Sequence, residues 1–200
     1  MPRSPEPARS RMLDAALELY AANGISATSL REIRLAAGQR NAAALQYHFG
    51  DKRGLLIALL ERELPTLVER REELLAEAVD LRSAAAVFVL PFAEFATGSD
   101  HERRLVQFLS ELHDDPDLTR EELVTLIGDT RSPVAFSRLC SFLPGTDFRV
   151  PDRRVAIAIG AFLHAAAVRA RRPVSDGSSD DQAFRDDLVD MFLGSVLGKY

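Results

Sequence analysis

The sequence has few of the residues on which disulfide-stabilised folds and metal sites depend. Its 200 residues include one cysteine, Cys140, so an intrachain disulfide is excluded, and the four histidines are scattered. Tryptophan is absent. A chain without disulfides is typical of a reducing compartment, and we therefore expect a cytoplasmic protein without a metal or other cofactor.

Long hydrophobic runs and strand patterns are also missing. The opening MPRSPEPARSR has no apolar core, unlike a signal peptide. The apolar stretch 155–168 is broken by His164 and is too short to span a bilayer. No run alternates β-branched with polar residues, and no hairpin dipeptide occurs. We expect an all-α protein with no membrane partner.

Charge is divided unevenly along the chain. Residues 1–54 carry eight Lys/Arg and five Asp/Glu, a net charge of +3, whereas the remainder carries 17 and 25, a net charge of −8. A basic head on an acidic body suits local contact with phosphates, although so small an excess can also arise by chance.

Helical signals fill the first fifty residues. A first helix is predicted from near Pro7 to Asn23-Gly24, with its apolar stripe at Met12, Leu13, Ala16, Leu17 and Tyr20. Ser29 and Glu32 have the spacing of a capping box, so a second helix should begin at Thr28 or Ser29 and end at Gly38. Asn41 is a good cap for a third helix. Three short helices with a tight turn before the last predict a helix-turn-helix.

The remainder predicts a larger helical region. Helices are expected over 55–78, 83–96, 101–113, 120–127, 133–143, 152–171 and 182–199, with a loop over 173–181. Pro65 and Pro91 fall inside two of these helices, and Pro65 in particular predicts a kink or break. The change of character after Lys52 predicts two domains, 1–54 and 55–200.

Residues 28–56 contain T-S-L-R-E-I, A-A-G and L-Q-Y-H-F-G-D-K-R-G-L-L in that order. This stretch resembles the DNA-binding domain of the tetracycline-repressor (TetR) family. The matching positions are Thr28, Ile33, Ala37, Gly38, Leu45, His48, Phe49, Lys52 and Leu55. The resemblance implies a regulator with a helix-turn-helix and a larger C-terminal helical domain that binds ligands and dimerises.

Two departures from the family pattern concern the turn and the recognition helix. The family has Val-Ser after Ala-Gly, whereas this chain has Gln39-Arg40-Asn41, one residue more. Since Asn41 lies four positions before Leu45, as the family's serine does, we place the insertion in the turn; a longer helix starting at Gln39 is the alternative. The usual Leu-Tyr is Leu45-Gln46, with the tyrosine displaced to Tyr47.

The predicted DNA contacts surround this turn. Ala42, Ala43 and Ala44 would form the first turn of the recognition helix and touch thymine methyl groups. Arg40 would reach guanine or a phosphate, Gln46 adenine, and Tyr47 a phosphate; alternatively, the three are solvent-exposed or packing residues. Lys52 matches the family's phosphate-contacting lysine. The full candidate set is Thr28, Ser29, Arg40, Asn41, Ala42, Ala43, Gln46, Tyr47 and Lys52.

Two further sets are predicted after residue 54. An apolar ligand cavity, or simply a core, would be lined by Phe88, Phe92, Phe95, Phe108, Leu112, His113 and His164. The last two helices are apolar nearly all round, which predicts either a homodimer interface or a buried pair within a monomer. The interface candidates are Ala158, Phe162, Ala165, Val189, Phe192 and Val196.

The leading functional hypothesis is a ligand-responsive homodimeric repressor. It would bind double-stranded DNA at a palindromic operator and be released by a small apolar or amphipathic effector. An activator or a ligand-independent regulator of the same fold is the alternative. A helical enzyme is disfavoured, because no paired carboxylates, nucleophile elbow or phosphate loop occurs, and Cys140 is interpreted as a small core residue.

Overall fold

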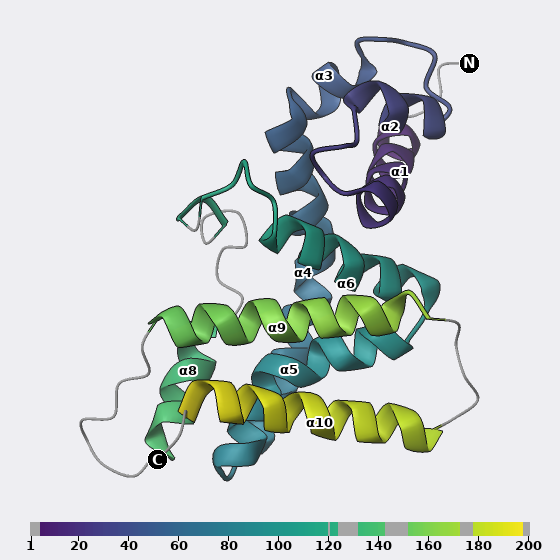
Figure 1. Ribbon diagram of the computed structural model, residues 1–200. Coiled ribbons are helices and arrows are strands. Elements are labelled where there is room, and N and C mark those ends of the chain that lie inside the picture. The colour runs from purple at the N-terminus through teal and green to yellow at the C-terminus, as the bar shows by residue number, and fades with distance from the viewer. Residues whose placement is uncertain (1–4, 120, 124–131, 143–151, 173–177, 198–200) are drawn as a thin grey trace.

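The computed structural model describes residues 5–119, 121–123, 132–142, 152–172 and 178–197, and these contain helices but no strand. The helices are α1 (Pro5–Asn23), α2 (Leu30–Ala36), α3 (Ala44–Phe49), α4 (Lys52–Glu77), α5 (Leu81–Thr97), α6 (Asp100–His113), α8 (Ser132–Ser141), α9 (Asp152–Ala170) and α10 (Ser178–Leu197). Helices α1 to α3 gather at one end, and α4 runs from them into a larger body (Figure 1). The predicted all-α fold with a small N-terminal and a larger C-terminal domain is confirmed.

The N-terminal domain is built around the predicted stripe of α1. Met12, Leu13, Ala16, Leu17 and Tyr20 are all buried. Ile33 of α2 and Leu45 of α3 complete this small core. Helix α1 ends where Gly24 takes a φ of +84°, a conformation that glycine adopts without steric cost.

The two prolines inside helices do not break them. Helix α4 continues through Pro65 and α5 continues through Pro91, so the predicted breaks are not found, and a kink at Pro65 stays a prediction. Helix α10 begins at Ser178, four residues before the predicted Gln182, and the predicted loop over 173–181 is wrong for its last residues. Of the predicted helix 120–127, residues 121–123 are helical and the others lie outside the described residues.

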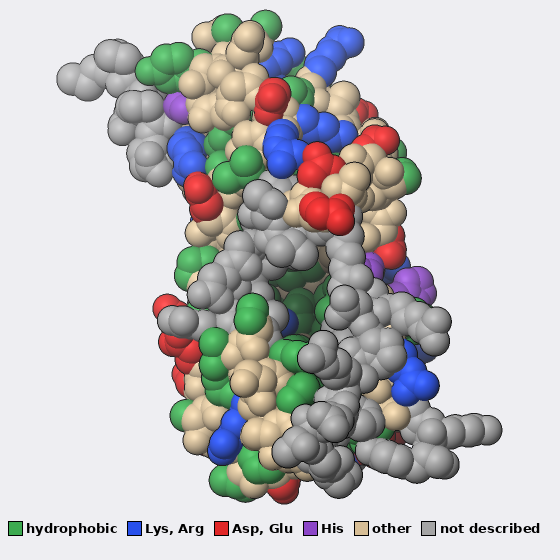
Figure 2. Space-filling view, turned by 90° about the vertical axis from the view of Figure 1, so that its left-hand side faces the viewer, with side chains coloured by type: hydrophobic (Ala, Val, Ile, Leu, Met, Phe, Trp, Pro, Cys, Tyr) green, Lys and Arg blue, Asp and Glu red, His purple; other side chains and the backbone are tan. Residues whose placement is uncertain are grey.

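The C-terminal domain packs α9 and α10 side by side against α5 (Figure 1). Aromatic rings join the three helices, with ring centroids 5.2 Å apart for Phe88 and Phe192 and 5.3 Å apart for Phe92 and Phe162. The face of this domain seen in Figure 2 is hollowed below the N-terminal domain, and hydrophobic side chains are visible in the hollow.

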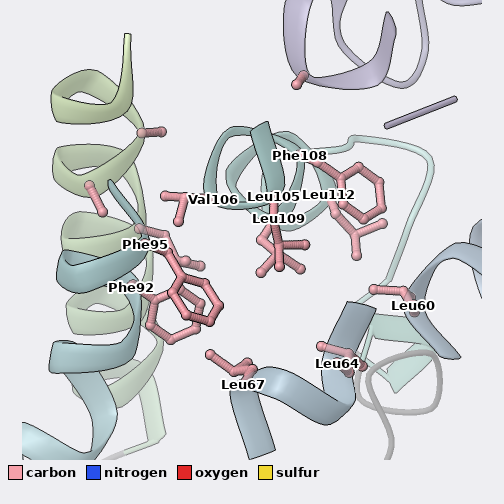
Figure 3. Packing of buried hydrophobic residues seen from close by; sticks show 14 of the residues in the cluster. Leu60, Leu64, Leu67, Phe92, Phe95, Leu105, Val106, Phe108, Leu109 and Leu112 are labelled. Atoms are coloured by element: carbon pink, nitrogen blue, oxygen red, sulfur yellow. The ribbon is translucent and has the colours of Figure 1, made fainter. Parts of the chain in front are cut away.

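A second part of this core lies between α4, α5 and α6. Leu64 and Leu67 of α4 point toward Leu109 of α6 and the phenylalanines of α5 (Figure 3). Because α4 also begins in the N-terminal domain, one continuous helix contributes to both cores.

Helix α6 packs against helix α1 of the N-terminal domain. Tyr20 of α1 stacks on Phe108 of α6 with 6.0 Å between ring centroids. Burial and, secondarily, the nearby Asp115 carboxylate raise the pKa of the Tyr20 phenol. The Ser26 hydroxyl donates to the Asp115 carboxylate at 3.2 Å. The junction thus combines aromatic packing with a polar contact.

A chain of charged groups links the same two domains at α4. Arg62 donates to Asp14 of α1 at 2.7 Å and to the adjacent Glu63 at 2.7 Å from its Nε. The buried Glu63 also lies 2.7 Å from Nε2 of His101, at the start of α6. Glu63 therefore joins α4 to α6, and Arg62 extends the link to α1.

Candidate nucleic-acid interface

The start of α2 is fixed by the predicted capping box. The Ser29 hydroxyl accepts from the backbone N–H of Glu32 at 3.2 Å, and the Glu32 carboxylate accepts from the backbone N–H of Ser29 at 2.8 Å. The Ser29 hydroxyl also donates to the Glu32 carboxylate at 2.6 Å, and this bond, together with the one from the Ser29 backbone N–H, lowers the pKa of Glu32. Ser29 itself is exposed on the surface of the domain.

Thr28 lies one residue earlier and is directed inward. Its side chain is buried, with 3% exposed, and its hydroxyl donates to the carbonyl of Gly24 at 2.8 Å. The prediction that Thr28 contacts DNA is therefore wrong for this hydroxyl, which instead ties the α1–α2 connection together.

The turn between α2 and α3 is long. Residues 37–43 separate the two helices, and residues 39–41 are not helical. The alternative of a recognition helix starting at Gln39 is thereby wrong. The prediction that Asn41 caps the third helix is wrong, because the N-cap position of α3 is Ala43 and has no side-chain cap hydrogen bond. The side-chain oxygen of Asn41 instead accepts from the backbone N–H of Ala43 within the turn, at 3.0 Å.

The recognition helix begins later than expected. Asn41 shapes a turn over Ala42 and Ala43, and α3 itself starts at Ala44. Ala44 is buried, so the prediction that all three alanines face DNA is wrong for Ala44. Ala42 and Ala43 remain exposed.

The other predicted base-reading residues lie at the surface. Arg40, Asn41 and Gln46 are exposed, and Tyr47 is 82% exposed, with its ring edge-on to His48. Lys and Arg side chains are also visible on the N-terminal domain in Figure 2. These exposed groups surround one short helix and its preceding turn, a size that fits the major groove.

Lys52 has a structural partner in addition to its predicted role. Its Nζ donates to the carbonyl of Ile25 at 2.5 Å, which joins the start of α4 to the α1–α2 connection. Asp51 caps α4 by accepting from the backbone N–H of Gly54 at 2.8 Å. The Lys52 side chain is half-buried, and its ammonium group has two further N–H groups that can donate to a phosphate.

Two structural residues of this domain were missed by sequence reasoning. A Cβ at position 54 would lie 1.9 Å from the carbonyl oxygen of Phe49, so only glycine fits there. Arg34 donates from one nitrogen to the carbonyls of Gln39 at 2.6 Å and Arg40 at 3.2 Å. The second glycine of H-F-G-D-K-R-G-L-L is Gly54, and its presence there was a usable signal. Nothing in the sequence marks the backbone carbonyls that accept from Arg34.

The comparison that decides the family concerns this same segment. The family model described as bacterial regulatory proteins of the tetR family matches residues 12–59, which contain most of α1, all of α2 and α3 and the start of α4. Residues 12–59 thus form a DNA-binding domain of the tetR family, and the predicted resemblance is confirmed. This domain makes the chain a DNA-binding transcriptional regulator. Among curated proteins, none matches the sequence.

Several solved structures share the fold over nearly the whole length of this chain. A regulatory protein in the tetR family from Rhodococcus RHA1 is 22% identical, with a TM-score of 0.60 over 94% of this chain and 96% of that chain. The FadR regulator from Bacillus subtilis, solved in complex with stearoyl-CoA, is 19% identical, with a TM-score of 0.59 over 96% and 99%. NalD from Pseudomonas aeruginosa, the secondary repressor of the MexAB-OprM multidrug efflux pump, is 24% identical, with a TM-score of 0.53 over 98% and 100%.

The predicted ligand residues do not all converge. Phe88, Phe92, Phe95, Phe108 and Leu112 are buried in the core described above. His113 lies against α9, where a Cβ on Gly160 would be 3.1 Å from its Nε2. His164 is exposed on α9, and the prediction that it lines a pocket is wrong. Periodicity did not reveal that this histidine faces outward.

The predicted dimer residues also lie mainly on the inner face. Ala158, Phe162, Val189, Phe192 and Val196 are buried within the single chain, so these five are wrong as an external contact surface. Ala165 is half-buried and stays a prediction. Among the α9 residues whose side chains the structure describes, the exposed ones are Ile157, Ala161, His164 and Val168. Their spacing of four, three and four places them on one face of the helix.

Neither a metal site nor a membrane segment is found in the part of the chain that the structure describes. No three His, Cys, Asp or Glu side chains come together there in a way that could hold a metal ion. No helix within those residues is both long and apolar enough to cross a bilayer. Cys140 packs against the core, and burial raises the pKa of its thiol.

Proposed function

We propose that this tetR-family protein is a ligand-responsive, homodimeric repressor that acts in the cytoplasm on a palindromic operator. The observation that carries the proposal is the exposed group of side chains around α3, on a domain of a DNA-binding family. The proposed contact set is Ser29, Arg40, Asn41, Ala42, Ala43, Gln46, Tyr47 and Lys52. We propose no enzymatic activity.

The proposed contacts divide into base readers and phosphate contacts. Arg40 can donate two hydrogen bonds to a guanine, and Gln46 can pair with an adenine in the major groove. The exposed methyl groups of Ala42 and Ala43 allow close approach of the backbone and contact with thymine methyl groups. Tyr47 and Lys52 would hold phosphates, which position the domain without reading sequence.

We assign the homodimer contact to the outer face of α9, with the neighbouring surface of α10. Ile157 is 66% exposed, and Val168, Ala161 and His164 extend the same face. Two recognition helices must lie about 34–36 Å apart to enter successive major grooves, which a two-fold dimer provides. The apolar residues on the outer face of α9 supply such a contact.

The effector is proposed to be a small apolar or amphipathic molecule that enters the C-terminal domain. The hollow with hydrophobic side chains in Figure 2 supports this assignment. The buried Arg71, with its guanidinium 5.4 Å from the centre of the Phe92 ring, adds a polar element that suits an amphipathic molecule. The FadR structure with stearoyl-CoA shows that a relative of this fold holds a ligand of amphipathic kind. Binding would favour a dimer whose recognition helices are wrongly spaced for the operator.

Selection of bound sequences from random DNA tests the repressor proposal. We expect enrichment of a palindrome and a steep loss of affinity as salt increases, because phosphate contacts release counterions. The selected operator is then titrated in the presence of a library of small metabolites, and release by one of them identifies the effector. Absence of any enriched sequence would contradict the DNA-binding role, and enrichment without release by any metabolite would contradict ligand control.

The dimer proposal has a separate test in solution. Ile157→Asp introduces a charge into the proposed contact and should shift the protein toward the monomer in light scattering. Val79→Asp is the matched control, because Val79 is 76% exposed in the α4–α5 connection, away from α9. If both variants keep the same mass as the unchanged protein, the face around Ile157 is not the dimer contact.

A further inference from the structure

The long turn before α3 is fixed firmly at both of its ends. After α2, the backbone N–H groups of Gly38 and Gln39 donate to the carbonyls of Leu35 and Arg34 at 3.0 Å each, while Gly38 takes a φ of +67°. This pattern is a Schellman motif, which closes the helix end. Before α3, Asn41 accepts from the backbone N–H of Ala43, and its own carbonyl accepts from that of Ala44 at 3.2 Å.

The middle of the turn is held by a side chain instead. The Arg34 guanidinium, from the last turn of α2, donates to the carbonyl of Gln39 at 2.6 Å and to that of Arg40 at 3.2 Å. Hydrogen bonds from a charged donor are stronger than those between neutral groups. These bonds connect α2 directly to the residues at which the turn is one residue longer than the family pattern.

Arg40 is the residue whose position depends on these bonds. Its carbonyl is tied to Arg34, whereas its side chain is exposed and makes no hydrogen bond or ion pair with the residues that the structure describes. A side chain can discriminate between bases only when its backbone is held within about 0.5 Å of the productive position. Without Arg34, the carbonyls of residues 39 and 40 would lose this link to α2.

We infer that Arg34 is a positioning residue for base readout: it holds the lengthened turn so that Arg40 presents its guanidinium to one defined base pair of the operator. The inference rests on the proposed DNA-binding function and adds a determinant of its specificity. Arg34 itself need not touch a base. A competing role is direct contact between Arg34 and a phosphate, because the first helix of a helix-turn-helix crosses the DNA backbone.

A double-mutant cycle on the selected operator separates these roles. Arg40→Ala should reduce discrimination at the base pair that Arg40 reads by about tenfold. Arg34→Ala should reduce discrimination at that same base pair to a similar extent. The double variant should lose little more discrimination, because both changes disrupt the same arrangement, in which Arg34 holds the turn that presents Arg40. Arg34→Lys, with a single donor nitrogen, should give an intermediate loss there. Arg104→Ala, an exposed arginine on α6, is the control and should leave the base preference unchanged.

The measurements are affinities for the operator and its single-base variants at several salt concentrations, with circular dichroism to confirm folding. Uniform weakening of all sequences by Arg34→Ala, with a salt slope smaller by about one, would show a phosphate contact and overturn the inference. So would losses from Arg34→Ala and Arg40→Ala that simply add, or an unchanged preference in both Arg34 variants. If Arg34→Ala does not fold, Arg34→Lys decides by the same comparison. Failure of the DNA-binding proposal is distinguishable, since the unchanged protein would then have no base preference.

Discussion

Lys52 shows how one side chain can serve the fold and a proposed contact together. Its Nζ reaches the carbonyl of Ile25 and thereby joins two connections of the N-terminal domain. The same ammonium group is the proposed phosphate contact, so the phosphate would be met by a group whose position is already fixed. Such preorganisation reduces the entropy lost when DNA binds.

Replacement of Lys52 by Met should therefore have two effects. We expect a loss of about 1 kcal/mol in the free energy of unfolding, because a hydrogen bond from a charged donor is removed at a half-exposed site. We also expect weaker binding to all DNA sequences alike, since a phosphate contact reads no base. Chemical denaturation and binding titrations check the two effects. A stability loss with unchanged DNA affinity would assign Lys52 to the fold alone.

Residue patterns predicted the cap of α2 better than the direction of individual side chains. Thr28 and Ser29 were both plausible caps, but only Ser29 has a glutamate three positions later, and only Ser29 caps. The Thr28 side chain points inward because its hydroxyl donates a hydrogen bond to the carbonyl of Gly24. Arg34 could not be assigned from sequence, because its acceptors are backbone groups that exist only once the turn has folded.

Helix α2 is stabilised at its start by a reciprocal pair that depends on a charged carboxylate. The hydrogen bonds from Ser29 lower the pKa of Glu32 in the folded state. The ionised form is therefore the one that the fold favours. The ionised Glu32 carboxylate therefore contributes to the free energy of unfolding. Its contribution is complete above the unfolded pKa of about 4.3 and is lost as the pH falls through the lower pKa of the folded state.

Comparison of Glu32→Ala with the unchanged protein tests this dependence on pH. The variant should be less stable at pH 7, and the part of the difference that comes from the charge should disappear in strong acid. Urea denaturation at a series of pH values measures it. Glu18→Ala, which removes an exposed carboxylate from α1 of the same domain, is the control and should show no comparable dependence. A difference that stays constant down to the lowest pH would contradict the role of the ionised carboxylate.

The helices themselves were largely predictable, whereas the faces they bury were not. Stripes such as that of α1 have one apolar side, so their spacing indicates the core. Helix α9 is apolar on more than one side, and its period is the same whichever side turns inward. Phe162 therefore looked as suitable for an outer contact as Ile157, although it packs between Phe92 and Phe192. Packing against α5 decides the choice, and that packing is not local in sequence.

At the scale of the molecule, the two domains are joined through Glu63. This carboxylate is buried and contacts both Arg62 and His101, while Arg62 reaches Asp14 of α1. A buried charge needs such partners, because burial without them is costly. The arrangement couples the position of the N-terminal domain to that of α6.

Glu63→Gln keeps the shape of the side chain but removes its charge. We expect a loss of roughly 1–3 kcal/mol in stability, because the amide keeps one acceptor oxygen, replaces the other with an NH2 donor and removes the charge that faces Arg62 at a buried site. For a chain of this size, that loss corresponds to a decrease of a few degrees in melting temperature for each kcal/mol. Glu61→Gln, at an exposed position of the same helix, is the matched control. Equal melting temperatures for Glu63→Gln and the unchanged protein would show that the network contributes nothing.

Helix α4 has 26 residues and so extends for about 39 Å, from the DNA-binding end into the body. Leu55 and Leu59 near its start are fully buried, as are residues further along that pack in the C-terminal core. A chain cut after residue 54 would leave both pieces with exposed apolar surface, because each piece covers apolar residues of the other. Calorimetry should accordingly record one heat-absorption peak rather than two, and a molecule bound in the body should raise the temperature at which the recognition helix melts.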